Sequence, residues 1–161
     1  MSQNKSDLVY VTFIRTTPEK LWAAITQPEF ARQYWGNSAN ISDWKAGSPW
    51  RLAHAGTPEE VRVVGEVVES TPPARLVLTW ADPAAPTDIS RVTYEIEAVE
   101  DLAKLTVTHG EFQDGSPMGG KVSWGWPRVL SSLKSFLETG RGLDLLGGCG
   151  HKAEPVQVKA N

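Results

Sequence analysis

The sequence predicts an α+β fold in which one antiparallel β-sheet packs against a helix near the C-terminus. Three observations point to this fold. A run of β-forming residues near the N-terminus leads directly into a helix-start signal. The middle of the chain alternates apolar and polar residues between closely spaced turn signals, which is typical of antiparallel strands with one buried face. Apolar residues then recur at helical spacing over residues 127–138.

Residues 8–15 are predicted to form the first strand because β-branched and aromatic residues crowd this segment. Thr17 is a favourable N-cap and Pro18 a favourable first helical residue, so the strand should pass directly into a helix. The apolar stripe of that helix begins at Leu21. Pro28 should end the first helix, and a second helical turn follows it.

Turn signals divide the middle of the chain into strand-like runs, which predicts an antiparallel meander. The signals lie at residues 45–47, 55–58, 71–73 and 82–86. Alternation is clearest over residues 91–96 and 104–108, where the sheet should have one dry and one wet face. The run from Val61 to Val68 is too apolar for simple alternation, so we expect it to be covered on both faces or bulged at Gly65.

Residues 127–138 are predicted to form an amphipathic helix along the sheet, with Gly140 as its C-cap. Residues 118–126 offer a preceding turn, but Pro127 has no N–H to donate, so a longer helix should kink or break there. The segment 141–161 is rich in glycine and has one short apolar patch. We therefore expect a domain over residues 1–140 and a flexible tail over 141–161 that docks at most at its start.

Composition narrows the class of protein. A chain of 161 residues with 40% hydrophobic content has enough material for one domain with a real core. The net charge of −3 comes from scattered residues of both signs, which disfavours nucleic-acid binding. No apolar run approaches the roughly 20 residues of a membrane-spanning helix, and no signal-peptide hydrophobic region is found. Cys149 is the single cysteine, so we expect a cytoplasmic protein without disulfides.

Several short motifs follow one another in a characteristic order between Leu8 and Gly140. The motifs are residues 17–22 followed by 28–29, residues 34–36, residues 47–50 at the start of a strand, and residues 125–140. Together they resemble the activator of Hsp90 ATPase homologue 1-like family, within the START-like (SRPBCC, helix-grip) superfamily. The resemblance implies a curled antiparallel sheet wrapped around a long C-terminal helix, two short helices after the first strand, and an elongated apolar cavity between sheet and helix.

The best polar candidate for that cavity is His109. It continues the inward parity of Leu105 and Val107, so its imidazole should point toward the C-terminal helix. The alternative is a histidine at a strand end that meets a backbone carbonyl or solvent. Glu111 has the same parity and the same two readings. The pair could act as acid and base or bind a polar ligand group, but no nucleophile or third orienting residue is identifiable.

Five further residues complete the predicted lining of the cavity. Trp80 and Tyr94 lie on the dry face of the sheet, while Met118, Val122 and Trp126 precede or open the covering helix. Core packing is the alternative for each, and it is the default for the tryptophans of this chain, because aromatic rings both fill cores and line pockets.

We predict neither a metal nor a cofactor, and we assign no catalytic residue. Cys149 and His151 form a C-x-H pair, but metal sites usually need three or four ligands and no others lie nearby in sequence. Phosphate-binding glycine motifs, nucleophile elbows and zinc-peptidase signatures are absent from the sequence. This favours a binding protein over an enzyme.

Three hypotheses about function remain. The first is binding of a small apolar or amphipathic molecule in the cavity, with selectivity from His109 and Glu111. The second, which only the resemblance suggests, is a stress-related co-chaperone that contacts a chaperone or another protein. The third is a cofactor-free cyclase or hydrolase that uses the same cavity. The sequence leaves the oligomeric state and the identity of the ligand open.

Overall fold

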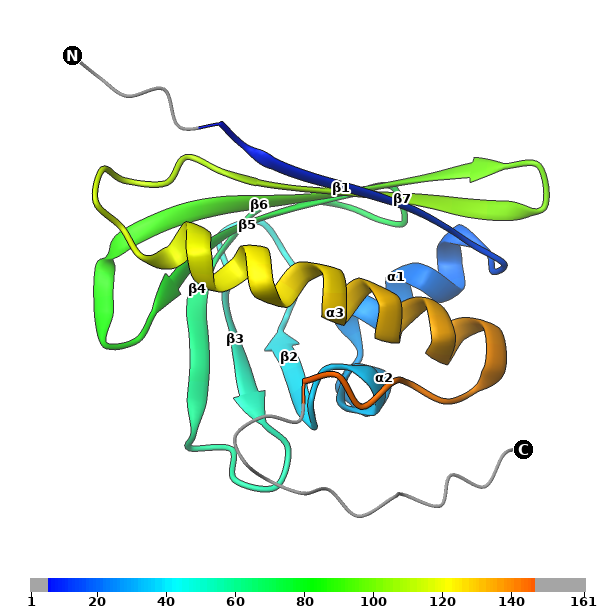
Figure 1. Ribbon diagram of the computed structural model, residues 1–161, viewed down its shortest axis with the longest axis horizontal. Coiled ribbons are helices and arrows are strands. Elements are labelled where there is room, and N and C mark those ends of the chain that lie inside the picture. Colours follow the sequence, from blue (N-terminus) through cyan, green and yellow to red (C-terminus); the bar gives the residue numbers. More distant parts are fainter. Residues whose placement is uncertain (1–5, 147–161) are drawn as a thin grey trace.

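A seven-stranded antiparallel sheet curls around one long helix, α3, as Figure 1 shows for the computed structural model. The structure describes residues 6–146. The strands are β1 (Leu8–Ile14), β2 (Ser38–Ser42), β3 (Pro49–His54), β4 (Val61–Thr71), β5 (Arg75–Asp82), β6 (Ala85–Val99) and β7 (Leu102–Gly110). The helices are α1 (Pro18–Thr26), α2 (Pro28–Tyr34) and α3 (Met118–Thr139). The predicted α+β helix-grip fold is confirmed.

The order of the strands across the sheet is β1-β7-β6-β5-β4-β3-β2. Strands β2 to β7 form a meander, and β1 joins its far edge by pairing with β7. The two edges of the sheet are therefore β1 and β2, which the helices α1 and α2 connect in sequence. The core lies between the inner face of the sheet and α3, and the alternating apolar residues of β5, β6 and β7 supply much of it.

Helices α1 and α2 close the sheet at the end near β2 (Figure 1). Thr17 caps α1 by accepting a hydrogen bond from the Lys20 N–H at 3.1 Å, and Pro18 stands in the first turn, both as predicted. The buried Tyr34 hydroxyl at the end of α2 donates to the Ala24 carbonyl at 2.9 Å. This bond holds the two short helices together and places Trp35 inside the molecule.

The long helix starts at Met118, so the preceding turn considered for residues 118–126 is part of it. It runs through Pro127, so the expected break there was wrong, while a kink stays a prediction. A proline removes only one main-chain hydrogen bond of the ladder. Burial of Met118, Val122 and Trp126 against the sheet keeps the preceding turns in place. The end of the helix is as predicted, because Gly140 has a left-handed conformation and donates its N–H to the Phe136 carbonyl.

The C-terminal half of α3 is fastened at its surface by polar contacts. The Lys134 ammonium donates to the Phe13 carbonyl of β1, and Glu138 accepts from the Arg15 N–H at 2.9 Å. The buried Ser132 hydroxyl accepts from the Leu143 N–H at 2.8 Å, which holds the chain that follows the helix. Residues 141–143 thus lie against α3, and Leu146 reaches Gly36 after α2. The remainder of the predicted tail, with Cys149 and His151, lies outside the described residues, and the division into a domain and a flexible tail stays a prediction.

Strand β4 carries a bulge, but not at the predicted glycine. The register shifts between Val67 and Glu69, which leaves Val68 as the extra, exposed residue. Gly65 stays in register opposite Trp50. Its role is to let the Trp50 indole cross β4 and donate its N–H to the Thr79 carbonyl of β5 at 2.8 Å. A Cβ on Gly65 would lie 1.9 Å from that carbonyl oxygen and 2.5 Å from the indole nitrogen.

Gly65→Ala is expected to lower the free energy of unfolding by about 1–3 kcal/mol, because the added methyl forces the Trp50 ring or strand β5 to shift. Chemical denaturation followed by circular dichroism measures the change. The matched control is Gly120→Ala in α3, where an added Cβ meets no atom within 4 Å. There the change should stabilise the protein by up to about 1 kcal/mol. Equal changes in the free energy of unfolding would contradict the close passage of the Trp50 indole over Gly65.

Candidate functional site

The last residue but one of β7, His109, is fully buried and has a hydrogen-bond partner on each ring nitrogen. The Trp126 indole N–H of α3 donates to Nδ1 at 3.0 Å. Nε2 lies 2.8 Å from the Ser90 hydroxyl of β6. The imidazole therefore joins the inner face of the sheet to the covering helix.

These contacts define the tautomer of the ring. An indole N–H can only donate, so Nδ1 must be an unprotonated acceptor. The neutral ring then carries its proton on Nε2 and donates it to Ser90. The Ser90 hydroxyl is left free to donate to the Trp80 carbonyl, at the longer distance of 3.4 Å. Every polar atom of this short chain has a partner, which is the condition for a stable buried polar group.

Burial lowers the pKa of His109 from 6.5 to about 4. The charged imidazolium is disfavoured because the surrounding side chains cannot solvate it, and protonation of Nδ1 would also set two N–H groups against each other. The histidine is therefore neutral at neutral pH. It presents one acceptor atom toward the helix side of the core.

Around the Trp126 indole lie four aromatic rings, which we call the aromatic cage: Trp35, Trp80, Tyr94 and His109. The ring centroids of these residues lie 5.9, 5.6, 6.0 and 6.2 Å from that of Trp126, respectively. Such separations are those of favourable edge-to-face and tilted aromatic pairs.

Six of the seven predicted cavity residues thus come together. Met118 and Val122 are buried on the turns of α3 that precede Trp126, and Trp80, Tyr94 and His109 lie opposite on the sheet. The rings of Trp80, Tyr94 and His109 each pair with the Trp126 indole, which therefore fills the space between them. Whether these residues line a ligand site stays a prediction.

Glu111 does not join them, and the expectation that it shares the inward parity of His109 was wrong. Strand β7 ends at Gly110, and Glu111 has a φ of +60°, which turns its side chain away from the sheet's alternation. The carboxylate is exposed and lies 3.3 Å from the Arg91 guanidinium. The acid and base pair considered from the sequence is therefore not formed.

Sequence reasoning missed three residues of this site. Ser90 has the same inward parity as Val92 and Tyr94, so the alternation in β6 could have revealed it. Trp35 lies in the connection after α2, where no periodicity applies. Phe112 lies beyond β7 and stacks on the His109 ring at a centroid distance of 4.8 Å.

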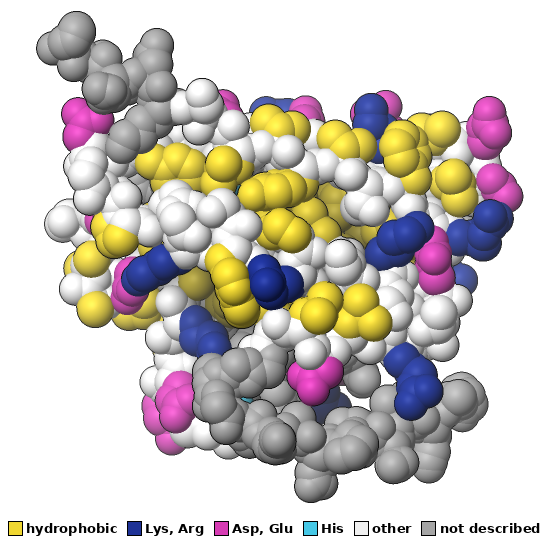
Figure 2. All heavy atoms as spheres, in the orientation of Figure 1, with side chains coloured by type: hydrophobic (Ala, Val, Ile, Leu, Met, Phe, Trp, Pro, Cys, Tyr) yellow, Lys and Arg dark blue, Asp and Glu magenta, His cyan; other side chains and the backbone are white. Residues whose placement is uncertain are grey.

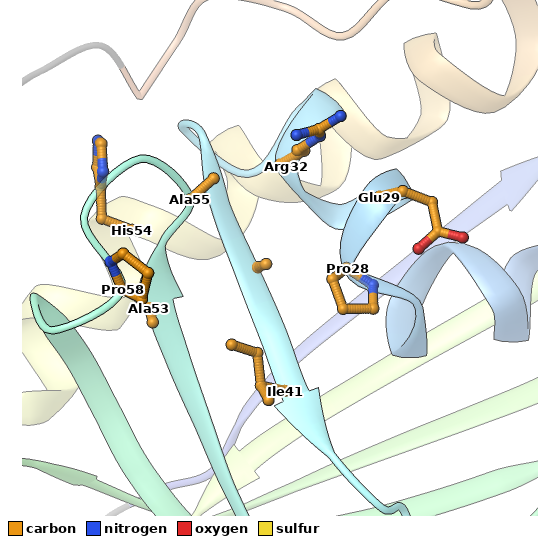
Figure 3. Close-up of a pocket in the computed structure, with 9 residues that line it drawn as sticks. Pro28, Glu29, Arg32, Ile41, Ala53, His54, Ala55 and Pro58 are labelled. Carbon is orange, nitrogen blue, oxygen red and sulfur yellow. The ribbon is translucent and has the colours of Figure 1, made fainter.

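A pocket of about 330 Å³ lies elsewhere, between α2 and the β2–β3 hairpin (Figure 3). Its lining is mostly apolar, with Glu29, Arg32 and His54 as the polar members. His54 lies at the end of β3, where its Nδ1 accepts the Gly56 N–H at 3.1 Å. No ion pair is formed by Glu29 or Arg32 with other residues in the range 6–146.

Hydrophobic side chains gather on the molecular face along which α3 runs (Figure 2). Trp124 on α3 is 51% exposed and is covered in part by the Arg128 guanidinium, 4.2 Å from its ring, so core packing was the wrong default for this tryptophan. The outer side of β1 exposes Val9, Val11 and Phe13.

Over residues 6–146, no group of three or more His, Cys, Asp or Glu side chains is arranged to hold a metal ion. In the same range no helix is long and apolar enough to cross a membrane.

Comparison with known proteins identifies the family. The sequence model of the family described as "Activator of Hsp90 ATPase homolog 1-like protein" matches residues 15–138. The chain belongs to this family. The match spans α1 through the body of α3, so it includes every element of the aromatic cage. No curated protein sequence matches the chain significantly.

Solved structures with the same fold include members of the Hsp90-activator type. The Aha1 dimer from Colwellia psychrerythraea is 20% identical, with a TM-score of 0.70, and the match covers 86% of this chain and 100% of that one. An HSP90 activator from Plasmodium falciparum is 23% identical, with a TM-score of 0.69 and coverages of 81% and 95%. CalU16 from Micromonospora echinospora is 20% identical, with a TM-score of 0.67 and coverages of 81% and 75%. These likenesses show the shared fold.

The buried histidine predicts a dependence of stability on acid. In the unfolded chain His109 takes up a proton near pH 6.5, whereas the folded protein resists protonation until about pH 4. The unfolded state therefore binds more protons between these values, and stability falls as the pH is lowered through them. We expect a loss of about 3 kcal/mol from this residue between pH 7 and pH 4.

Urea denaturation at several pH values measures that loss, with His109→Gln as the control because glutamine does not titrate. The free energy of unfolding of the wild-type protein should fall more steeply than that of the variant between pH 6.5 and pH 4. Parallel curves would mean that His109 has an ordinary pKa.

Proposed function

We propose that this member of the family binds a small apolar or amphipathic molecule between the sheet and α3, in the space that the Trp126 indole now occupies. The observation that carries the proposal is the polar contact between Trp126 and the buried, neutral His109 within a ring of aromatic side chains. An apolar enclosure with one or two placed polar groups is the usual chemistry of a small-molecule site.

Access to this space would come through the first half of α3. That half contains Gly119, Gly120 and Gly125, and each glycine costs a helix roughly 1 kcal/mol relative to alanine. Pro127 removes a main-chain hydrogen bond at its end. At its start the Ser116 hydroxyl accepts the Met118 N–H at 3.0 Å. Two polar contacts tie this half to the sheet: the Trp126 indole donates to His109, and the Lys121 ammonium donates to the Asp82 carboxylate of β5 at 3.2 Å. The glycines make this half the less stable part of the helix, and its separation from the sheet breaks these two contacts.

The hypothesis of a cyclase or hydrolase finds less support. It depended on an acid and a base side by side, and Glu111 instead pairs with Arg91 at the surface. His109 has both nitrogens engaged and a low pKa, so it is a weak proton acceptor in the closed protein.

An Hsp90-activating role is the second candidate. It is supported by membership of the family and by the fold shared with the HSP90 activator from Plasmodium falciparum. The partner in this case is a chaperone, and the exposed Trp124 on α3 is a residue of the type that anchors protein interfaces. Both candidate functions suit the cytoplasmic location expected from the single cysteine.

Native mass spectrometry of freshly purified protein tests the first candidate. We expect a bound mass that disappears on denaturation, or, after stripping, uptake of apolar molecules from a panel. The double variant Gly120→Ala with Gly125→Ala should take up the same molecules more slowly, because a stiffer helix opens less often. Failure of every panel member to bind the stripped wild-type protein would refute the proposal.

A second assay tests the chaperone role. The ATPase rate of a purified Hsp90 should rise when this protein is added. Trp124→Ala should weaken this effect without loss of stability because the ring is half exposed. An unchanged ATPase rate over a range of concentrations would remove this candidate.

A further inference from the structure

We propose that the Trp126 indole is a built-in substitute for the ligand, and that the molecule which replaces it is a planar aromatic compound with one N–H or O–H group that donates to His109 Nδ1. This inference rests on the proposed function and names the ligand chemistry of that site. It is drawn from the contacts of a single side chain.

The indole of Trp126 is a flat, two-ring aromatic group held among the rings of the aromatic cage, and it is 2% exposed. The space vacated by this ring has flat aromatic walls on several sides. A planar aromatic ligand restores these contacts, whereas a flexible alkyl chain restores only part of the buried area.

The Ser90 hydroxyl can donate to or accept from His109 Nε2. Its donation to the Trp80 carbonyl at 3.4 Å leaves it the acceptor, which favours the tautomer with the proton on Nε2 also after the indole has left. When the indole leaves, Nδ1 remains as a buried acceptor that needs a donor. A ligand without an N–H or O–H group leaves this atom unpaired, which is unfavourable in an apolar interior. The site should therefore select donors and reject isosteres that have only acceptors.

Met118 and Val122 lie on the turns of α3 that precede the Trp126 indole, and both are buried in the same core. Separation of these turns from the sheet uncovers the ring. A change in the Trp126 rotamer then frees both the aromatic cage and the Nδ1 acceptor, without any rearrangement of the strands.

Indole and benzofuran form a matched pair of probes because they have nearly the same shape. Indole has an N–H donor where benzofuran has a ring oxygen, which cannot donate. Isothermal titration of the full-length wild-type protein should give tighter binding of indole by about tenfold, the cost of one unpaired buried acceptor. In Trp126→Ala, where the internal competitor is gone, indole should bind more tightly than to the wild type and keep its preference over benzofuran.

His109→Leu removes the acceptor and serves as the control. This variant should bind indole and benzofuran equally. If Trp126→Ala does not fold, Trp126→Leu is used with pyrrole and furan, which are the corresponding smaller pair. Retention of the indole preference in His109→Leu, or equal binding of the two probes by Trp126→Ala or its substitute, overturns the inference.

The two proposals fail in different ways. If the wild-type protein binds apolar molecules but Trp126→Ala shows no preference for the donor, a ligand site exists and the inferred chemistry is wrong. If Trp126→Ala prefers indole while the stripped wild-type protein binds nothing, the aromatic cage has the inferred selectivity and the proposed function is wrong.

Discussion

The neutral imidazole of His109 is the group on which the relation between sheet and helix depends. Ser90 on one strand, His109 on the next and Trp126 on α3 form a single hydrogen-bonded chain through an otherwise apolar interior. A buried polar group is tolerated only when each of its polar atoms has a hydrogen-bond partner. These hydrogen bonds therefore permit few alternative positions of α3 over the sheet. Apolar packing alone would tolerate more sliding of one layer on the other.

Two tryptophan indoles perform similar tasks in different surroundings. Trp50 spans strand β4 to reach a backbone carbonyl on β5, and this requires the missing side chain of Gly65. Trp126 reaches across the core to a side chain on the sheet. The Trp50 ring lies against the backbone of β4 and β5. The Trp126 ring is carried by a turn of the glycine-rich part of α3. This contrast is why the second ring, and not the first, is the candidate for exchange with a ligand.

Much of the fold could be predicted from local signals. Caps, prolines and alternation are properties of a few adjacent residues, so the start of α1, the strands β6 and β7 and the end of α3 were all foreseeable. The unbroken passage of α3 through Pro127 was not, because the residues before the proline have poor helix propensity and are held by burial in the core. The bulge at Val68 also depends on the pairing with β5, which the sequence of β4 alone does not contain.

The candidate site also combines features that adjacent residues predict with features that depend on distant contacts. Strand parity placed His109 inward, but its failure at Glu111 came from a single left-handed residue after the strand end. Trp35 and Phe112 reached the site from irregular segments, where no period links neighbouring residues to a face. The hydrogen bond from Trp126 to His109 is a contact between two elements. It could be established only from the packed structure.

The position of Pro127 next to Trp126 gives the proposed opening a definite order of events. Nine residues at 1.5 Å per residue put Met118 about 13 Å from the proline, so a rotation of roughly 20° there moves that end by about 5 Å. The same rotation moves the Trp126 backbone by only about 0.5 Å. Entry of a ligand and its exchange with the indole are therefore separable steps. The Met118 end of α3 admits a molecule while the Trp126 indole still donates to His109. Uptake should have two kinetic phases, and only the second depends on this hydrogen bond.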